Sequence, residues 1–175
     1  MSVRAAPEAL LPWALSVLGI SGGPRPSLSV VAGDASQRRY FRFALAARSY
    51  VAVEAPPATE KNAAFLQVGA LLADAGVKVP EVLGVDLDRG FLLLEDLGDR
   101  MLLPALDPAS VVVHYGHAFE VLVRMAAADV SHAGLGNYDD VLLREELGRF
   151  QQWFVQGLLG YEPTATEQEV LDDVF

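Results

Sequence analysis

The chain has 175 residues, of which 52% are apolar and 21% charged, so it can bury a sizeable core and global disorder is excluded. Its formal net charge of −10 at pH 7 disfavours nonspecific nucleic-acid binding, which requires a net basic face. The absence of cysteine excludes disulfides, thiolate catalysis and cysteine-type zinc sites.

The amino terminus lacks the basic start and the unbroken apolar centre of a signal peptide, and Pro7–Leu18 instead predicts an amphipathic helix. No apolar run reaches the roughly 18 residues that a membrane span needs, so we expect no membrane partner. An acidic chain without disulfides fits the cytoplasm, and a chain without cysteine is also compatible with export. The high alanine content and the excess of arginine over lysine indicate a bacterial, GC-rich genome.

Several segments have the alternating or apolar pattern of β-strands. In the clearest of them, Tyr40 and Arg42 share one face while Phe41 and Phe43 share the other. The expected strands are Ser27–Val31, Arg39–Leu45, Ser49–Ala55, Val82–Asp86 and Phe91–Glu95.

A helix is predicted over Thr59–Ala75, with Thr59 as its N-cap and Gly76 as its C-terminal cap. After Gly98 only helices are expected, over 108–128, 138–159 and 166–175. Strands followed by helices predict an α+β fold in two parts, 1–97 and 98–175. Aromatic and apolar residues of the later helices are expected in a core; these are Tyr115, Phe119, Leu122, Met125, Phe150, Trp153 and Phe154.

The last expected helix has a start signal, Thr166 before Glu167, but no stop signal, and it ends on the apolar Phe175. We interpret this end as that of a truncated chain. Two alternatives remain open: a terminal helix that docks on its own core, and a dimer formed through the exposed apolar face of this helix.

The turn between the first two expected strands has the composition of a phosphate-binding loop. Small residues from Gly33 to Ser36 let backbone N–H groups face a phosphate, and the Ser36 hydroxyl adds a donor. Arg38 or Arg39 can add charge and a bidentate fork. An ordinary polar hairpin is the alternative interpretation.

The second notable segment is Gly90–Gly98, in which a buried strand runs into Glu95 and Asp96. A crevice between two lobes is a usual place for a ligand. Backbone groups at such a junction can pair with a flat heterocycle, which Leu94 and Leu97 can sandwich. The alternative is a plain buried strand followed by a turn.

Together these segments resemble the N-terminal part of the aminoglycoside phosphotransferase-like kinase family. Segments 33–42, 53–57 and 90–98 are most similar to the bacterial N-acetylmuramate/N-acetylglucosamine anomeric kinases of cell-wall recycling, and segment 138–153 is similar to the same group. The resemblance covers nearly the whole chain.

The resemblance implies a protein-kinase-like N-terminal lobe, a five-stranded antiparallel sheet plus a helix, followed by the first helices of an incomplete C-terminal lobe. It implies ATP, Mg²⁺ in the complete enzyme, and a sugar or alcohol hydroxyl as the phosphoryl acceptor. By the same resemblance, residues 35–39 cover the phosphates, Val53 lies near the nucleotide, and the backbone of Glu95 and Leu97 contacts adenine. The implied nucleotide-binding residues are Ala35, Ser36, Gln37, Arg38, Arg39, Val53, Glu95 and Leu97.

Two departures from the family pattern stand out. The expected third strand carries no Lys or Arg over residues 50–54, where many relatives place one to hold phosphates. No histidine begins the family's catalytic His-x-Asp loop, so we identify neither a catalytic residue nor a metal ligand in this chain. We therefore expect the chain alone to be inactive; the alternative is a catalytically dead nucleotide-binding or protein-interaction module.

Overall fold

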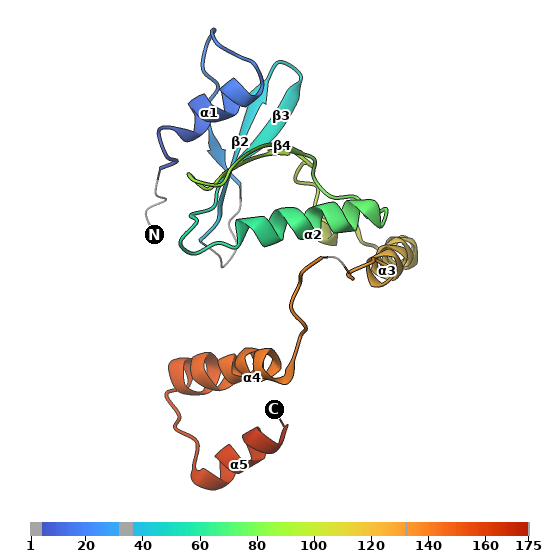
Figure 1. Cartoon of the computed structure of the whole chain (residues 1–175). Coiled ribbons are helices and arrows are strands. Elements are labelled where there is room, and N and C mark those ends of the chain that lie inside the picture. Colours follow the sequence, from blue (N-terminus) through green and yellow to red (C-terminus); the bar gives the residue numbers. More distant parts are fainter. Residues whose placement is uncertain (1–4, 32–36, 132, 175) are drawn as a thin grey trace. The chain divides into compact units, whose positions relative to one another are not determined.

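The computed structural model of the chain describes residues 5–31, 37–131 and 133–174. The first of its two compact units contains a five-stranded antiparallel sheet (Figure 1). The strand order is β1-β2-β3-β5-β4. The predicted strands are confirmed, and the second, fourth and fifth have the predicted bounds. They are β1 (Ser29–Val30), β2 (Arg39–Leu45), β3 (Arg48–Glu54), β4 (Val82–Asp86) and β5 (Phe91–Glu95).

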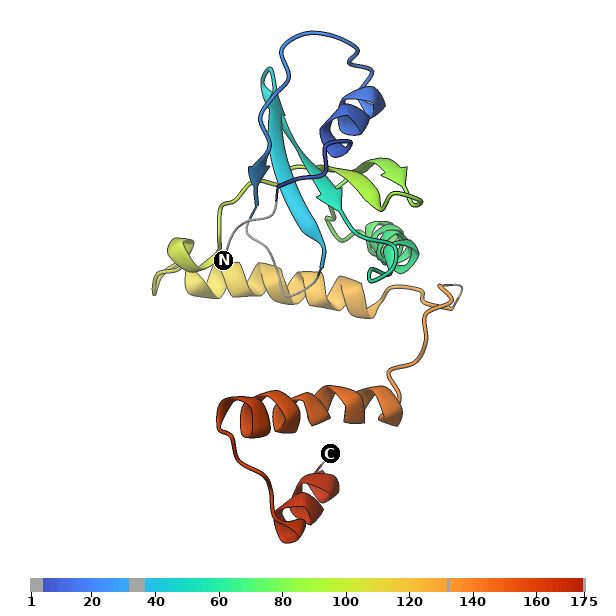
Figure 2. The same cartoon turned by 90° about the vertical axis from the view of Figure 1, so that its left-hand side faces the viewer.

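The predicted helices are also present, and after β5 the regular elements of the described chain are helical (Figure 2). The helix expected over 138–159 consists of an α-helix that continues as a π-helix. The short 3₁₀ turn η1 was not predicted. The helical elements are α1 (Leu10–Val17), α2 (Asn62–Asp74), η1 (Leu103–Ala105), α3 (Val111–Ala126), α4 (Asp140–Arg149), the π-helix η2 (Phe150–Leu158) and α5 (Ala165–Val174).

The alternation of β2 places its two phenylalanines under α1. Phe41 and Phe43 are each 2% exposed, and they share a cluster with Trp13 of α1 and Phe91 of β5. The rings of Trp13 and Phe91 lie 5.6 Å apart between centroids. Burial of each such side chain contributes about 1.5–3 kcal/mol, so this cluster fixes α1 on the sheet.

The opposite face of the sheet packs against α2 (Figure 1). Leu92 and Leu94 of β5 cluster there with Val53, and Phe65 and Leu66 of α2 cover them. Because consecutive side chains of a strand point to opposite faces, β5 contributes to both clusters. Its continuous apolar run is the pattern of a strand buried on both sides.

The start of α2 differs from the prediction. The N-cap position is Lys61, without a side-chain cap, and Thr59 instead donates its hydroxyl to the carbonyl of Pro56 in the preceding turn. The first helical residue, Asn62, is 6% exposed and donates to the carbonyl of Ala55 at 2.8 Å. A buried amide thus ties the start of α2 to the end of β3, and the predicted threonine cap is not formed.

The unit from Gly134 to Phe175 is compact by itself. Asp139 caps α4 by accepting the N–H of Leu142 at 2.9 Å. The predicted start signal of the last helix at Thr166 is wrong, because Thr164 and Glu167 hydrogen-bond each other's backbone N–H groups in a capping box. That reciprocal pair begins α5 one residue earlier.

The expected core positions on the later helices are exposed. Phe119 of α3 is 63% exposed and Trp153 of η2 is 68% exposed, and the other residues of the set are also exposed. Within the described part of each unit, no element buries these side chains, which is why the prediction fails here. Val170 and Val174 of α5 are exposed as well; dimerisation through them stays a prediction.

The two compact units are Met1–Ala133 and Gly134–Phe175. The expected division into lobes at residues 97 and 98 falls where the chain has just left the sheet, since β5 ends at Glu95. That division stays a prediction. In the described part of the chain, none of the helices combines the length and apolarity needed to cross a membrane.

Gly90 is a position where the fold requires glycine. Its φ of +68° lies in the left-handed region, and a β-carbon there would overlap the carbonyl oxygen of Ala55. We therefore expect Gly90→Ala to lower the free energy of unfolding by at least about 2 kcal/mol, because backbone strain and the steric overlap add. Urea unfolding followed by circular dichroism measures this change.

Gly22→Ala is the matched control, because a β-carbon at Gly22 meets no atom within 4 Å. Its unfolding free energy should stay within about 0.5 kcal/mol of the wild-type value. Equal losses in the two variants would contradict the requirement for glycine at position 90.

Candidate functional site

The loop before β2 and the linker after β5 lie at opposite ends of the same three strands. Arg39, at the start of β2, is in register with Glu54 of β3, which is opposite Phe91 at the start of β5. At the other end, Phe43 of β2 is in register with Tyr50, which is opposite Glu95. These two rows are four residues apart, roughly 13 Å along the strands. The two segments expected to bind a ligand are therefore separated along the strands.

The expected phosphate end is only partly described. Ala35 and Ser36 lie outside the described residues, and Gln37 is exposed. The guanidinium of Arg38 lies 3.1 Å from the Glu60 carboxylate, and it is stacked 4.6 Å above the ring of Phe65. The arginine therefore connects the loop to the start of α2.

Arg39 is also engaged with protein groups. It forms an ion pair with Glu54 of β3 and donates to the carbonyl of Ala5 at 3.0 Å. Both arginines predicted to bind phosphate thus have carboxylate partners. A phosphate group at this end would share these guanidinium groups or displace the carboxylates, and Arg retains its charge in either case.

The remaining predicted residues differ in accessibility. Val53 is fully buried, so its side chain belongs to the core of the α2 face. The N–H of Glu95 donates to Glu81 at 2.8 Å, so a contact from Glu95 to a base would come from its carbonyl oxygen. Leu97 is 53% exposed and follows directly in the linker.

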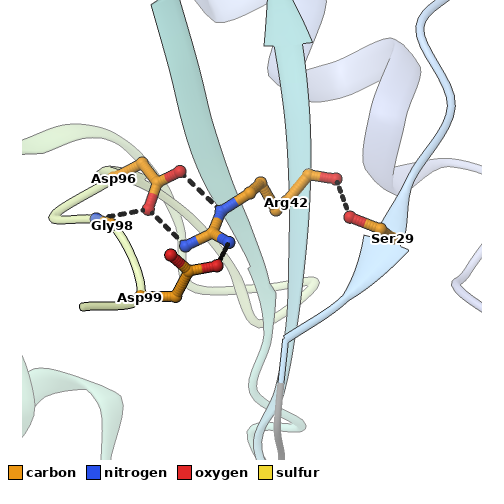
Figure 3. Close-up of polar contacts among 5 residues, drawn as sticks. All are labelled: Ser29, Arg42, Asp96, Gly98 and Asp99. Carbon is orange, nitrogen blue, oxygen red and sulfur yellow. Dashed lines mark hydrogen bonds and ion pairs between the residues drawn. The ribbon is translucent and has the colours of Figure 1, made fainter. Parts of the chain in front are cut away.

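An ion-pair cluster that sequence reasoning missed fixes the linker to β2 (Figure 3). The Nε and Nη2 atoms of Arg42 donate to the two carboxylate oxygens of Asp96 at 2.6 and 2.9 Å. The Nη1 atom donates to Asp99 at 3.0 Å. A signal was present in the sequence, since Arg42 is a charged residue within an apolar strand, but the sequence alone did not identify its partners.

The ion pairs of the cluster shift the pKa values of Asp96 and Arg42. Hydrogen bonds from the Arg42 guanidinium, opposed by burial and aided by Ser49 and the N–H of Gly98, lower the pKa of Asp96 to about 2. The same hydrogen bond from Arg42 to Asp96 raises the pKa of the guanidinium. Asp96 is therefore ionised throughout the physiological range, and the pair stays charged.

No set of three or more acidic or histidine side chains that could hold a metal ion occurs within residues 5–31, 37–131 and 133–174. Asp96 and Asp99 are neutralised by Arg42 rather than arranged around a shared ligand position. No chemical step is assigned to a metal held by the described residues.

The model of the phosphotransferase enzyme family matches residues 27–175 of this chain. The chain belongs to this family. The family and the kinase-like fold expected from the sequence are thereby confirmed.

Two relatives indicate where in the family the chain lies. The N-acetylmuramate/N-acetylglucosamine kinase of Pseudomonas aeruginosa is 39% identical over 155 residues, which are 89% of this chain and 46% of the relative. The protein of the same name from Pseudomonas putida is 39% identical over 137 residues, 78% of this chain and 40% of the relative. This phosphotransferase-family chain thus spans less than half the length of these relatives.

A crystal structure supports the fold. A protein assigned as an aminoglycoside phosphotransferase from Ralstonia eutropha JMP134 matches with a TM-score of 0.62 at 23% identity. The match covers 94% of this chain and 51% of that protein. At this identity the likeness shows a shared fold and nothing of the substrate.

The low pKa of Asp96 predicts how stability depends on pH. A carboxyl whose pKa falls on folding, here from 3.8 to about 2, stabilises the folded state above its unfolded pKa. That stability is lost as the pH falls from about 4 to about 2. Between pH 5 and pH 2, wild type should lose about 1–2 kcal/mol more unfolding free energy than Asp96→Asn. This range allows for solvent screening of the ion pair, because Arg42 is partly exposed.

Urea unfolding across this pH range measures the difference. Arg42→Met is the matched variant, because it removes the main cause of the shift while keeping the carboxyl. Arg42→Met should flatten the pH dependence of the unfolding free energy to the same extent as Asp96→Asn. The double variant, Arg42→Met with Asp96→Asn, should show no further change. A wild-type slope in Arg42→Met would contradict the assignment of the shift to this pair.

Proposed function

We propose that this chain carries the nucleotide-binding part of an ATP-dependent phosphotransferase that acts on a sugar hydroxyl. One observation carries the proposal: the loop before β2 and the linker after β5 occupy opposite ends of the same three strands. A nucleoside triphosphate has a flat base at one end and a polyanion at the other. The exposed backbone of the linker suits the base, and the arginines of the loop suit the polyanion.

In this proposal the phosphates lie against residues 35–39, with Arg38 and Arg39 supplying positive charge. Because β3 carries no lysine at Val53, these two guanidinium groups take over the role of a third-strand base. Their ion pairs with Glu60 and Glu54 keep them in place before the nucleotide binds. The carbonyl of Glu95 and the backbone of Leu97 contact the adenine. Val53 lies opposite Tyr40, near the loop end of the strands, and supports the nucleotide there from the core.

The proposed acceptor is an amino sugar. Support comes from the relatives named as N-acetylmuramate/N-acetylglucosamine kinases. Phosphoryl transfer depends on positioning of the hydroxyl and on charge neutralisation at the phosphates. Mg²⁺ supplies part of that neutralisation in the complete enzyme, and we assign its binding to none of the residues that the structure describes. The proposed setting is the recycling of cell-wall sugars in the cytoplasm of a bacterium.

Nucleotide binding tests the first part of the proposal. The chain should bind both ATP and adenosine in isothermal titration calorimetry. Arg38→Met and Arg39→Met should each weaken ATP binding about 5–10-fold, because a charge-assisted contact to phosphate is lost, and should leave adenosine binding nearly unchanged.

Arg25→Met is the control, since Arg25 is exposed and lies outside the proposed loop. It should leave both affinities within about twofold of wild type. Equal effects of all three arginine variants on ATP would contradict a specific phosphate end, and a wild-type chain that binds neither ligand would refute the nucleotide site.

Phosphoryl transfer tests the second part. The 175-residue chain alone should release no ADP from ATP. Joined to the remaining carboxyl-terminal part of the Pseudomonas aeruginosa relative, it should release ADP when N-acetylmuramate or N-acetylglucosamine is added. A coupled pyruvate kinase assay measures the release. Release with choline but with neither sugar would disprove the amino-sugar acceptor while leaving ATP binding intact.

A further inference from the structure

The linker after β5 is attached to β2 by a single guanidinium (Figure 3). Arg42 lies in the row of Val51 and Leu94, so its side chain starts on the α2 face of the sheet. It reaches Asp96, which is 54 residues away in sequence. The side chain of Asp96 is 3% exposed and that of Asp99 is 84% exposed, so the cluster has one buried and one exposed acid.

The Asp96 carboxylate also shapes the linker itself. Its Oδ1 atom accepts the N–H of Gly98 at 2.9 Å, and Gly98 has a φ of +84°. This is the local turn that aspartate forms with the backbone two residues ahead. Leu97 therefore lies between two anchored residues, and the direction of its backbone groups depends on where Arg42 holds the carboxylate.

Because of these same contacts, Arg42 is not available to bind the phosphates. Three of its nitrogen atoms already donate to carboxylate oxygens. A phosphate that displaced Asp96 would leave a buried carboxylate without its main partner, which is strongly unfavourable. Arg42 also lies three residues along β2 from Arg39, toward the linker and away from the loop. Its position is therefore at the base end of the proposed nucleotide site.

We propose that Arg42, Asp96 and Asp99 form a latch that holds the linker in the conformation in which the backbone of Leu97 meets the purine ring. Arg42 is then a positioning residue for the base, acting through Asp96. This inference rests on the proposed function, because it requires a nucleotide lying along β2, β3 and β5.

Ligands that share the base but differ in phosphate content test the latch. Arg42→Met should weaken the binding of adenosine and of ATP by the same factor, about tenfold, because one well-oriented backbone contact to the base is lost. Calorimetry is done at a temperature where circular dichroism shows each variant to be folded. In the free protein, hydrogen exchange at the amides of residues 97–100 should be faster in Arg42→Met than in wild type.

Arg89→Met is the matched control. Arg89 pairs with Asp86 at 2.6 Å in the turn between β4 and β5, so the variant removes a comparable ion pair without touching the linker. Its adenosine and ATP affinities should stay within about twofold of wild type. Asp99→Asn is a milder second variant that keeps the buried Arg42–Asp96 pair. It should weaken the binding of both adenosine and ATP about two- to threefold.

The outcomes separate the two proposals. If wild type binds neither ligand, the proposed function fails, and the latch fails with it. If wild type binds both, three results overturn the latch alone: a loss of ATP affinity without a loss of adenosine affinity in Arg42→Met, unchanged affinities in that folded variant, or unchanged exchange at residues 97–100. The first would assign Arg42 to the phosphates.

Discussion

The burial of β5 on both faces determines where the candidate site can be. Phe91 and Leu93 pack under α1, while Leu92 and Leu94 pack under α2, so the strand cannot slip by one residue without exchanging its two apolar sets. This register fixes the point at which the chain leaves the sheet, immediately after Glu95. The linker and its ion pair with β2 follow from that exit point. The geometry of the site thus depends on hydrophobic packing first and on polar contacts second.

Local patterns were sufficient to predict most of the sheet. The alternation of Phe41 and Phe43 with Tyr40 and Arg42 predicted the two faces of β2, and a turn ending in Gly90 bounded β4 and β5 correctly. These signals are short-range, since strand periodicity and glycine turns act within a few residues. They could be read from the sequence because no distant partner is needed to produce them.

The features that were missed depend on which polar groups meet in the folded chain. The pair of Arg42 and Asp96 joins residues 54 positions apart, and the burial of Asn62 depends on the end of β3. Thr59 was predicted to cap α2 because its residue type suits that role, but the turn after Pro56 takes up its hydroxyl. Only the Arg42 pair is long-range, since Thr59 and Asn62 bond to groups three and seven residues away. In each case the folded backbone selects among polar groups that the sequence alone leaves equivalent. The sheet that carries the candidate site was predictable from local signals, whereas the ion pairs at the candidate site were not.

Electrostatics distinguishes this site from a simple basic anion pocket. The chain carries a net charge of −10, and the arginines at positions 38, 39 and 42 each face a carboxylate. Such pairing keeps the guanidinium groups ordered and lowers the local positive potential, so the proposed polyanion would gain specificity at Arg38 and Arg39 from geometry more than from long-range attraction. A triphosphate bound here would need further positive charge from a metal ion. The family chemistry is consistent with this requirement, because phosphotransferases of the kinase type bring the nucleotide together with Mg²⁺ rather than relying on protein cations alone.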